Sequence, residues 1–310
     1  MRDISNPVFH DEEKARAFLE GERWPAGVVC PFCNKREGVT ALQGKSMGPG
    51  WYYCNLCDQK KFTVRTGSVM ERSHVPLAKW ALAFRLIAAS KKGMSSKQLE
   101  RMLGVTYKTA WFMSMRIRAA MSQDGLTPIG GDEKFVEADE TFVGGKSTNI
   151  QKGKPLSKKK PVVALIERHG EARARAVPDV TGKTVRNVVV TQASRDSYLM
   201  TDDASIYVGI GKEFYSHSVV QHAKREYARL GGSVHTNTAE AFFAILKRGI
   251  TGSFHSVSEQ HLQRYVDEFV FRWNTRIALG FDDAQRASEM VKAGVGKRLT
   301  YRPSDSAKDA

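Results

Sequence analysis

Residues 134–143 read KFVEADETFV and are followed by Gly144-Gly145. A short run rich in apolar and β-favouring residues that stops at glycines predicts a strand, and this strand carries Asp139. A second stretch, SYLMTD at 197–202, ends in Asp202. A third, NTAEAFFAILKRG at 237–249, opens a helical segment and carries Glu240. Carboxylates grouped like this hold divalent metal ions against phosphates, so these three acids form the candidate site.

The elements around these acids alternate between strands and helices. Strands are predicted at 162–168, 172–177, 198–201 and 214–220, and helices at 184–190, 238–248 and 257–272. Three strands, a helix and a further strand, closed by terminal helices, outline an RNase H-like fold, an α/β fold with a mixed sheet flanked by helices. Its fourth strand runs beside its first, so Asp139 and Asp202 are expected about 4.8 Å apart across neighbouring strands. Glu240 would then reach the pair from a helix packed across the sheet edge.

Glu240 also has a purely structural interpretation. Asn237-Thr-Ala-Glu240 has the Asx-x-x-Glu pattern of a capping box at a helix start. In addition, Glu137, Glu140 and Asp203 compete for the role of metal ligand. With 33 acidic residues in the chain, the pattern alone leaves these alternatives open.

All four cysteines lie in the first 57 residues, as Cys30-Pro-Phe-Cys33 and Cys54-Asn-Leu-Cys57. Two Cys-x-x-Cys pairs separated by 20 residues match a tetrahedral four-cysteine zinc site of the ribbon type. Two disulfides or a redox pair are the alternatives, which a cytoplasmic setting disfavours. No cysteine is left over, so the sequence predicts one structural zinc ion in a closed site.

Residues 75–121 have a helical pattern. A helix begins near Leu77, a short one capped by Ser95 or Ser96 follows, and a Gly104-Val105-Thr106 turn leads into TYKTAWFMSMRIRAAM. This order predicts a helix-turn-helix-like unit; an ordinary three-helix unit with a solvated basic face is the alternative. The basic residues predicted to contact DNA are Lys108, Arg116 and Arg118.

The composition favours a polyanionic partner. The 310 residues include 48 Lys and Arg against 33 Asp and Glu, a formal net charge of +15. Such a charge favours nucleic acid through counterion release. No secretory signal is visible, and the longest apolar run, WALAFRLIAA, is broken by Arg85 well short of the ~18 residues of a membrane span. A soluble cytoplasmic, nucleoid-associated protein with no membrane partner is expected.

The stretches VEADETFVGGK, TDDASIY and HTNTAEAFFAILKRGITGSFHSVSEQHLQRYVDEFVFRWNTR resemble bacterial insertion-sequence transposases with a DDE core. Together with CPFC and YYCNLCDQKKFTVRTGSVMERSHVPLAKW, they resemble the zinc-ribbon-bearing ISXO2-like group over most of residues 24–276. The resemblance implies that Asp139 and Asp202 are the two catalytic aspartates and Glu240 the third acid. Lys247 matches the basic residue that follows the glutamate. Some members of the group have Asn in the third position, which makes Asn237 the alternative to Glu240.

The resemblance implies a DNA transposase that binds the ends of an insertion sequence, cleaves a strand with water and joins the freed 3′-hydroxyl to target DNA. Two Mg²⁺ ions (or Mn²⁺) in the active site and a homodimer on double-stranded DNA are implied with it. Lysines in the 144–161 loop would add phosphate contacts. Two alternatives remain: a zinc-ribbon and helix-turn-helix regulator with an inactive RNase H-like domain, and a nuclease that cuts without joining.

The expected domain organisation has four parts. They are a zinc ribbon with an N-terminal extension at 1–68, a helix-turn-helix-like unit at 69–123, an RNase H-like core at 132–276 and a basic C-terminal tail at 277–310.

Overall fold

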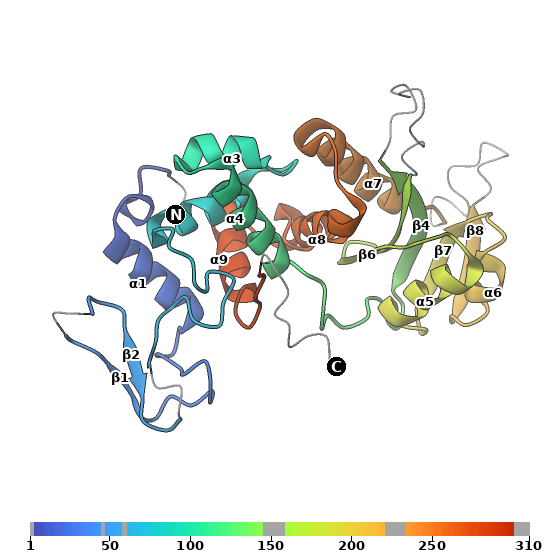
Figure 1. Ribbon diagram of the computed structural model, residues 1–310. Coiled ribbons are helices and arrows are strands. Elements are labelled where there is room, and N and C mark those ends of the chain that lie inside the picture. Colours follow the sequence, from blue (N-terminus) through green and yellow to red (C-terminus); the bar gives the residue numbers. More distant parts are fainter. Residues whose placement is uncertain (1–2, 45–46, 58–60, 145–158, 221–233, 301–310) are drawn as a thin grey trace, which may run out of the picture. The chain divides into compact units, whose positions relative to one another are not determined.

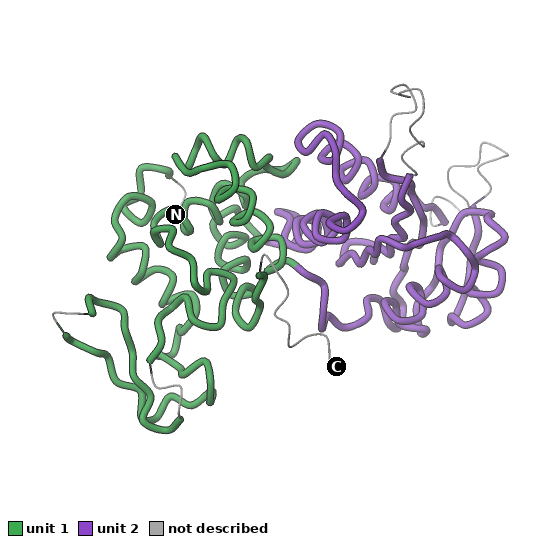
Figure 2. The backbone as a smooth tube through the Cα atoms, viewed as in Figure 1, with its two compact units in different colours: residues 1–121, 281–310 green, residues 122–280 purple. Residues whose placement is uncertain are grey.

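The computed structural model describes residues 3–44, 47–57, 61–144, 159–220 and 234–300 (Figure 1). The chain divides into two compact units (Figure 2). Unit 1 comprises residues 1–121 and 281–310, and unit 2 comprises residues 122–280. The predicted lysine-rich loop contacts at 144–161 fall mostly outside the described residues.

Unit 2 contains a five-stranded mixed sheet. Its strands are β4 (Phe135–Val143), β5 (Lys160–Glu167), β6 (Ala172–Ala176), β7 (Tyr198–Asp202) and β8 (Ser216–Val220). Their spatial order is β6-β5-β4-β7-β8; β4 and β6 are antiparallel to β5, whereas β7 is parallel to both β4 and β8. A three-stranded meander extended by two parallel strands on its first-strand side is the RNase H-like topology, so the predicted fold class is confirmed.

Helices cover both faces of this sheet. The helices of unit 2 are α5 (Gly182–Gln192), α6 (Tyr207–Gly211), α7 (Asn237–Gly249) and α8 (Glu259–Asn274), with short turns η4 (Ile250–Phe254) and η5 (Ile277–Leu279). Val136 and Ala138 of β4 pack into the core with α5 and α6, and Val143 packs with α7 and α8. Because strand side chains alternate between faces, Glu137 and Asp139 belong to the α7 face.

The outer edge of the sheet, at β6, is closed by amide side chains. Gln123 both donates to the Ala174 carbonyl and accepts from the Ala174 amide, at 2.8 and 3.0 Å. Asn274 does the same for Ala172, at 3.2 and 2.7 Å. Gln263 accepts from the Ala176 amide at 2.8 Å and donates to the Ala174 carbonyl at 3.2 Å. Asp267, which is buried, accepts from both glutamines at 2.7 Å. The exposed hydrogen-bonding groups of an edge strand are thereby satisfied within the unit.

Unit 1 begins with a short turn and a helix, then a small sheet. These are η1 (Pro7–Phe9), α1 (Glu12–Arg23) and the antiparallel strands β1 (Val39–Ala41), β2 (Tyr52–Cys54) and β3 (Lys61–Phe62). Four further helices complete the unit: α2 (Leu77–Ala89), α3 (Ser96–Leu103), α4 (Tyr107–Ala120) and α9 (Asp283–Ala293).

Helices α3 and α4 form a hairpin in the segment for which a helix-turn-helix-like unit was predicted. Ser95 caps α3 through the amide of Gln98, and Thr106 caps α4 through the amide of Thr109. Gly104 ends α3 with φ of 58°, the left-handed conformation that glycine adopts without steric cost. The local backbone therefore explains why serine and threonine stand before the two helices and why glycine stands between them.

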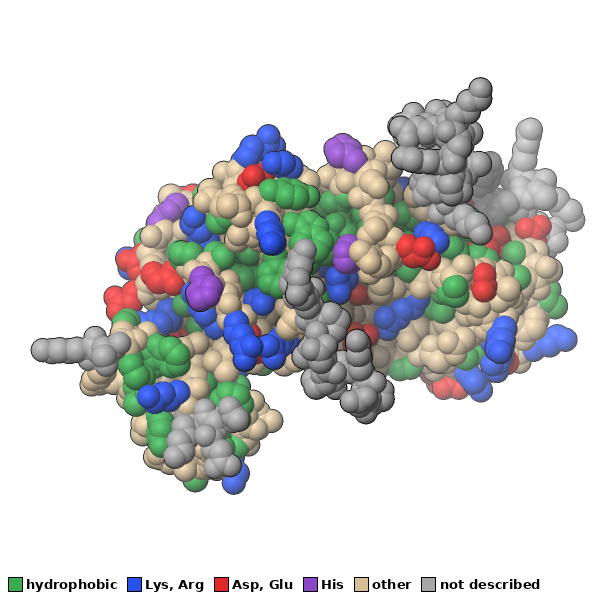
Figure 3. Space-filling model, viewed as in Figure 1, with side chains coloured by type: hydrophobic (Ala, Val, Ile, Leu, Met, Phe, Trp, Pro, Cys, Tyr) green, Lys and Arg blue, Asp and Glu red, His purple; other side chains and the backbone are tan. Residues whose placement is uncertain are grey.

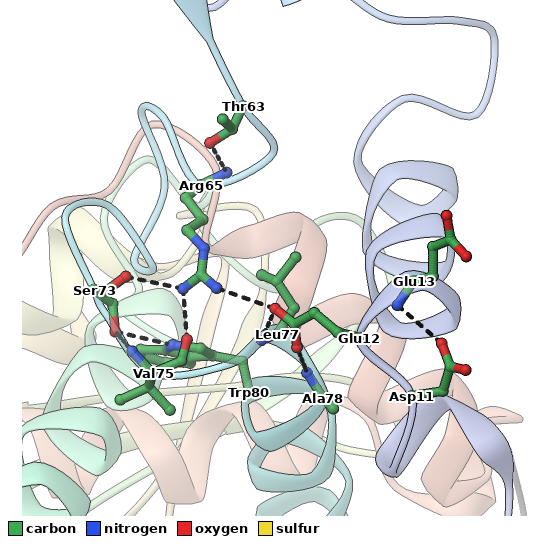
Figure 4. Close-up of polar contacts among 10 residues, drawn as sticks. All are labelled: Asp11, Glu12, Glu13, Thr63, Arg65, Ser73, Val75, Leu77, Ala78 and Trp80. Atoms are coloured by element: carbon green, nitrogen blue, oxygen red, sulfur yellow. Dashed lines mark hydrogen bonds and ion pairs between the residues drawn. The ribbon is translucent and has the colours of Figure 1, made fainter. Parts of the chain in front are cut away.

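The N-terminus of α2 is capped by a residue from another helix (Figure 4). Its N-cap is Pro76, which makes no side-chain cap, and the Glu12 carboxylate of α1 instead accepts from the amides of Leu77 and Ala78, at 2.8 and 3.1 Å. Arg65 lies 3.5 Å from Glu12 and donates to the carbonyls of residues 73 and 75. Through these contacts, Arg65, which follows β3, is connected to α1 and to the residues just before α2.

Helix α9 lies in the segment that was expected to be a tail. Asp282 and Gln285 form a capping box at its start, and its face buries Ala287, Met290 and Val291. Arg286 donates to the Ala88 carbonyl of α2 at 3.1 Å. The segment is helical because its apolar residues recur at helical spacing after a capping box. The basic residues that follow made the whole segment resemble a polar tail. Residues 301–310 lie outside the described ones. Among the described residues, no helix is both long and apolar enough to span a membrane.

Candidate active site and metal centre

The four cysteines converge on one point in unit 1. Their sulfur atoms all lie within 4.8 Å of one another, with Cys30 and Cys57 at 3.6 Å and Cys33 and Cys54 at 3.7 Å. These separations exceed a disulfide bond. They fit a tetrahedron of sulfurs about 3.8 Å apart around zinc at about 2.3 Å. Although burial opposes ionisation, backbone amides of Cys33 and Phe32 and the neighbouring thiols lower the pKa of Cys30 to about 7. The donor set therefore fits the predicted structural zinc ion.

In unit 2, the strand register brings two of the predicted acids together. β4 pairs with β7 in parallel through Val136 opposite Leu199 and Glu137 opposite Met200. Asp139 and Asp202 each lie two residues beyond the last of these pairs, at the same end of the two strands. Both side chains are half-buried. Asp202 also accepts from the Ala204 amide at 3.2 Å, which orients its carboxylate at the end of the strand.

The Asp139 carboxyl group is electrostatically linked to the other acids. Burial, followed by the charges of Glu140, Asp202 and Glu240, raises its pKa to about 7, against a hydrogen bond from the Glu140 amide that lowers it. A carboxylate that is costly to ionise because other carboxylates surround it is well suited to bind a cation. Glu240, which is exposed on α7, contributes the smallest of these three charge effects.

The competing acids Glu137 and Glu140 are engaged in other contacts. Glu140 accepts a hydrogen bond of 2.6 Å from the buried Tyr207 hydroxyl of α6, and burial raises the pKa of Glu140. Glu137 is completely buried and accepts from residues 168, 238 and 239. Asp203 is exposed. Of the five acids on or just after β4 and β7, Asp139 and Asp202 therefore remain the candidate pair for a metal ion.

The capping-box interpretation of Glu240 does not fit the start of α7. The N-cap of the helix is Thr236, so Glu240 is its fourth residue, whereas a capping box places the glutamate third. The helix amides at 238 and 239 are bound by Glu137 instead. Asn237 is the first residue of α7 and is exposed. Sequence reasoning attached no role to Glu137 beyond a rival ligand, because its helix partner lies 101 residues away.

The three predicted acids do not form a tight cluster of ligand atoms. Within the described residues, the four cysteines are the one group of three or more metal-ligating side chains whose ligand atoms all lie within 4.8 Å. Asp139, Asp202 and Glu240 are not such a group; the charges of Asp202 and Glu240 act on the Asp139 carboxyl group electrostatically. Lys247, also exposed on α7, lies seven residues after Glu240, which is about 10 Å along the same face.

The three basic residues predicted to contact DNA have different environments. Lys108 is exposed on α4. Arg116 is buried, donates to the carbonyls of Val69 and Glu71 at 3.0 and 2.8 Å, and stacks on Phe112. Arg118 is 1% exposed and donates to Ser114 at 3.1 Å. A guanidinium held in this way is not presented to a phosphate, so the prediction is corrected for Arg116 and Arg118.

Comparisons with known proteins match both units. A model of the ISXO2-like transposase domain matches residues 130–274, and a model of the transposase zinc-ribbon domain matches residues 10–60. An uncharacterized protein in the transposable element ISH50 of Halobacterium salinarum is 26% identical over 281 residues, covering 86% of this chain and 92% of that protein.

Solved structures match more distantly. The Mos1 strand transfer complex is 13% identical, over 71% of this chain and 79% of that chain, with a TM-score of 0.28. The Mos1 paired-end complex with the left transposon end is 10% identical, over 69% and 74%, with a TM-score of 0.27.

Proposed function

Because the chain belongs to the transposases with an ISXO2-like transposase domain and a transposase zinc ribbon, we propose that unit 2 cleaves and joins DNA strands in a metal-dependent reaction at Asp139, Asp202 and Glu240. The observation that carries the proposal is the position of Asp139. Its carboxyl group is half-buried, and its pKa is raised to about 7 by burial and then by the charges of Glu140, Asp202 and Glu240.

The donor set fits hard divalent cations. All three side chains offer carboxylate oxygens, which Mg²⁺ and Mn²⁺ prefer. When bound, two such ions supply activation of the attacking oxygen and stabilisation of the departing oxygen in an in-line displacement at phosphorus. Asp139 would hold both ions, and Asp202 and Glu240 one each.

The chain's own residues would position the DNA. Lys247, on the same face of α7 as Glu240, would bind a phosphate near the reacting end. Water would be the nucleophile for cleavage and a freed 3′-hydroxyl for joining, so no protein nucleophile is required. The zinc ribbon and the α3–α4 hairpin, with Lys108 exposed, would bind the ends of the element. Bringing two ends together would need a homodimer.

A strand-transfer assay on the full chain tests the proposal. Oligonucleotides that carry the element's end are incubated with target DNA in Mg²⁺ or Mn²⁺. We expect Asp139→Ala, Asp202→Ala and Glu240→Gln each to lower joining by about 10³-fold or more, the scale of losing a group that stabilises charge in a transition state. Asn237→Ala is the matched control on the same helix and should join normally.

The outcomes separate the alternatives. Joining that persists in one of the three acid variants would remove that residue from the site, and loss of joining in Asn237→Ala would give Asn237 the third position. A wild-type protein that binds ends but never cleaves, with binding unchanged in Asp139→Ala, would instead identify a regulator. Cleavage without joining would identify a nuclease.

A further inference from the structure

Glu137 is the most heavily bonded buried acid on the α7 face of β4. Its side chain is 0% exposed. One carboxylate oxygen accepts from the amides of Thr238 and Ala239, at 2.8 and 3.0 Å. The other accepts from the Thr238 hydroxyl at 2.9 Å and from Arg168 Nε at 2.7 Å.

The positive partner of Glu137 is Arg168, which follows β5. Arg168 also donates to the His235 carbonyl at 2.9 Å, so it binds both the strand acid and the chain just before α7. His235 Nδ1 lies 3.1 Å from Glu137 but without hydrogen-bonding geometry. Burial lowers the pKa of His235, which leaves it neutral at pH 7. The charge of Glu137 is therefore balanced by Arg168 and by the positive end of the α7 dipole.

These contacts fix where α7 begins against the sheet. The N-cap Thr236 makes no side-chain cap, so the amides that start the helix are held by the Glu137 carboxylate of a distant strand. The apolar face of α7, with Phe242, Phe243 and Leu246, packs in the core with the sheet, and apolar packing specifies a register less strictly than hydrogen bonds do. A charged hydrogen bond to particular amides does set the register of the helix, because sliding the helix by one residue would break that bond.

We propose that Glu137, clamped by Arg168, is a positioning residue that sets the separation of Asp139 and Glu240. Asp139 is two residues after Glu137 on the same face of β4, about 7 Å along the strand. Glu240 directly follows Ala239, whose amide Glu137 binds. One buried carboxylate thus fixes the strand acid and the helix acid in a common frame. The inference rests on the proposed site, since it assigns Glu137 a role through Glu240.

The test measures Mn²⁺ binding to the full chain by titration calorimetry or electron paramagnetic resonance. Glu137→Gln keeps the shape but loses the charge, and we expect it to weaken Mn²⁺ binding on the order of 10- to 100-fold, the usual effect of losing a residue that orients a metal ligand. Glu268→Gln is the matched control, because Glu268 is equally buried and is paired with Arg272 on α8 at 2.7 Å. It should leave Mn²⁺ binding unchanged even where it lowers the melting temperature.

A double-variant cycle distinguishes positioning from general stability. In a Glu240→Gln background, Glu137→Gln should weaken Mn²⁺ binding by no more than about 2-fold, because the residue that it positions no longer acts as a ligand. Unchanged binding in Glu137→Gln, or an equal loss with and without Glu240, would overturn the proposal. Should Glu137→Gln fail to fold, Thr238→Ala removes one donor to the same carboxylate. It should weaken binding by a few-fold, and no change would count against the proposal.

Failure of the proposed function has a different signature. Mn²⁺ binding that depends on Asp139, Glu240 and Glu137 in a protein that joins no DNA would contradict the transposition reaction and leave the positioning role intact. Strand transfer that requires Asp139, together with normal Mn²⁺ binding in Glu137→Gln, would contradict the positioning role and leave the proposed reaction intact.

Discussion

The Asp139 carboxyl group couples the stability of unit 2 to pH. Its pKa of about 7, raised first by burial and then by neighbouring acids, compares with 3.8 for an ordinary aspartate. Between these two values the folded state holds a proton that the unfolded state has lost, so the free energy of unfolding falls as pH rises from about 4 to about 7. The rise from 3.8 to about 7, at about 1.36 kcal/mol for each pH unit, gives an upper value of about 4 kcal/mol.

We therefore expect Asp139→Asn to be more stable than the wild type at pH 8 without metal, and the difference to shrink toward pH 4. Thermal unfolding of both proteins across this range measures it. Added Mn²⁺ should stabilise the wild type alone. The exposed Asp196→Asn is the control and should follow the wild type. A constant difference between Asp139→Asn and wild type at all pH values would contradict the burial argument.

Residue positions could be predicted where the order of the strands determines them. The alternation of β4 and the order of strands were sufficient to expect Asp139 beside Asp202. The sequence could not reveal that Glu137 caps a helix 101 residues away, because the partner of a buried acid is set by tertiary structure. The burial of Arg116 and Arg118 could not be predicted for the same reason: a basic residue on a helix has the same local signal whether it is solvated or donates to buried carbonyls.

The β6 edge is an element whose stability depends on three amide side chains. We expect Gln263→Ala to lower the free energy of unfolding by about 1–3 kcal/mol, the cost of leaving buried polar groups unpaired, and to expose the strand to edge-to-edge association. Chemical unfolding and light scattering of the full chain measure both effects. Gln260→Ala, at an exposed position one turn earlier on α8, should change neither. A Gln263→Ala protein as stable and as monodisperse as Gln260→Ala would show that the amides are dispensable.

The elements of unit 2 were predicted more closely than those of unit 1. The long apolar strands and helices came within a few residues of their observed bounds, as with 162–168 for Lys160–Glu167 and 238–248 for Asn237–Gly249. Helices α1 and α9 were missed, because their apolar residues are few and charged residues dominate the local sequence. Their helical structure depends on packing within unit 1, which no window of the sequence contains.

For the whole molecule, the net charge of +15 predicts binding to DNA that weakens steeply with salt. Lys and Arg side chains are spread over the visible face among acidic ones (Figure 3), so the attraction is not confined to one patch there. With 6–10 phosphate contacts, we expect affinity for duplex DNA to fall by about 10³–10⁵ between about 50 and 200 mM salt. Lys108→Gln should reduce the slope of log affinity against log salt by about 1.

Fluorescence anisotropy with labelled duplexes across a salt series measures that slope. Lys14→Gln, which removes another exposed lysine of unit 1, is the control for net charge alone and should leave the slope within error. Equal slopes for wild type and Lys108→Gln would exclude a phosphate contact at this residue.

Helix α9 has a consequence for the order in which the protein can be made. Unit 1 needs residues from both ends of the chain, with 159 residues of unit 2 between Met121 and Phe281. At a synthesis rate of about 5–20 residues per second, roughly 8–30 s pass between the synthesis of unit 1's first segment and that of α9. Until then, the surface of α2 that contacts α9 is uncovered. During that interval the nascent chain exposes apolar residues that the finished protein buries. A message interrupted after residue 280 would thus yield a protein whose unit 1, and not its unit 2, is left incomplete.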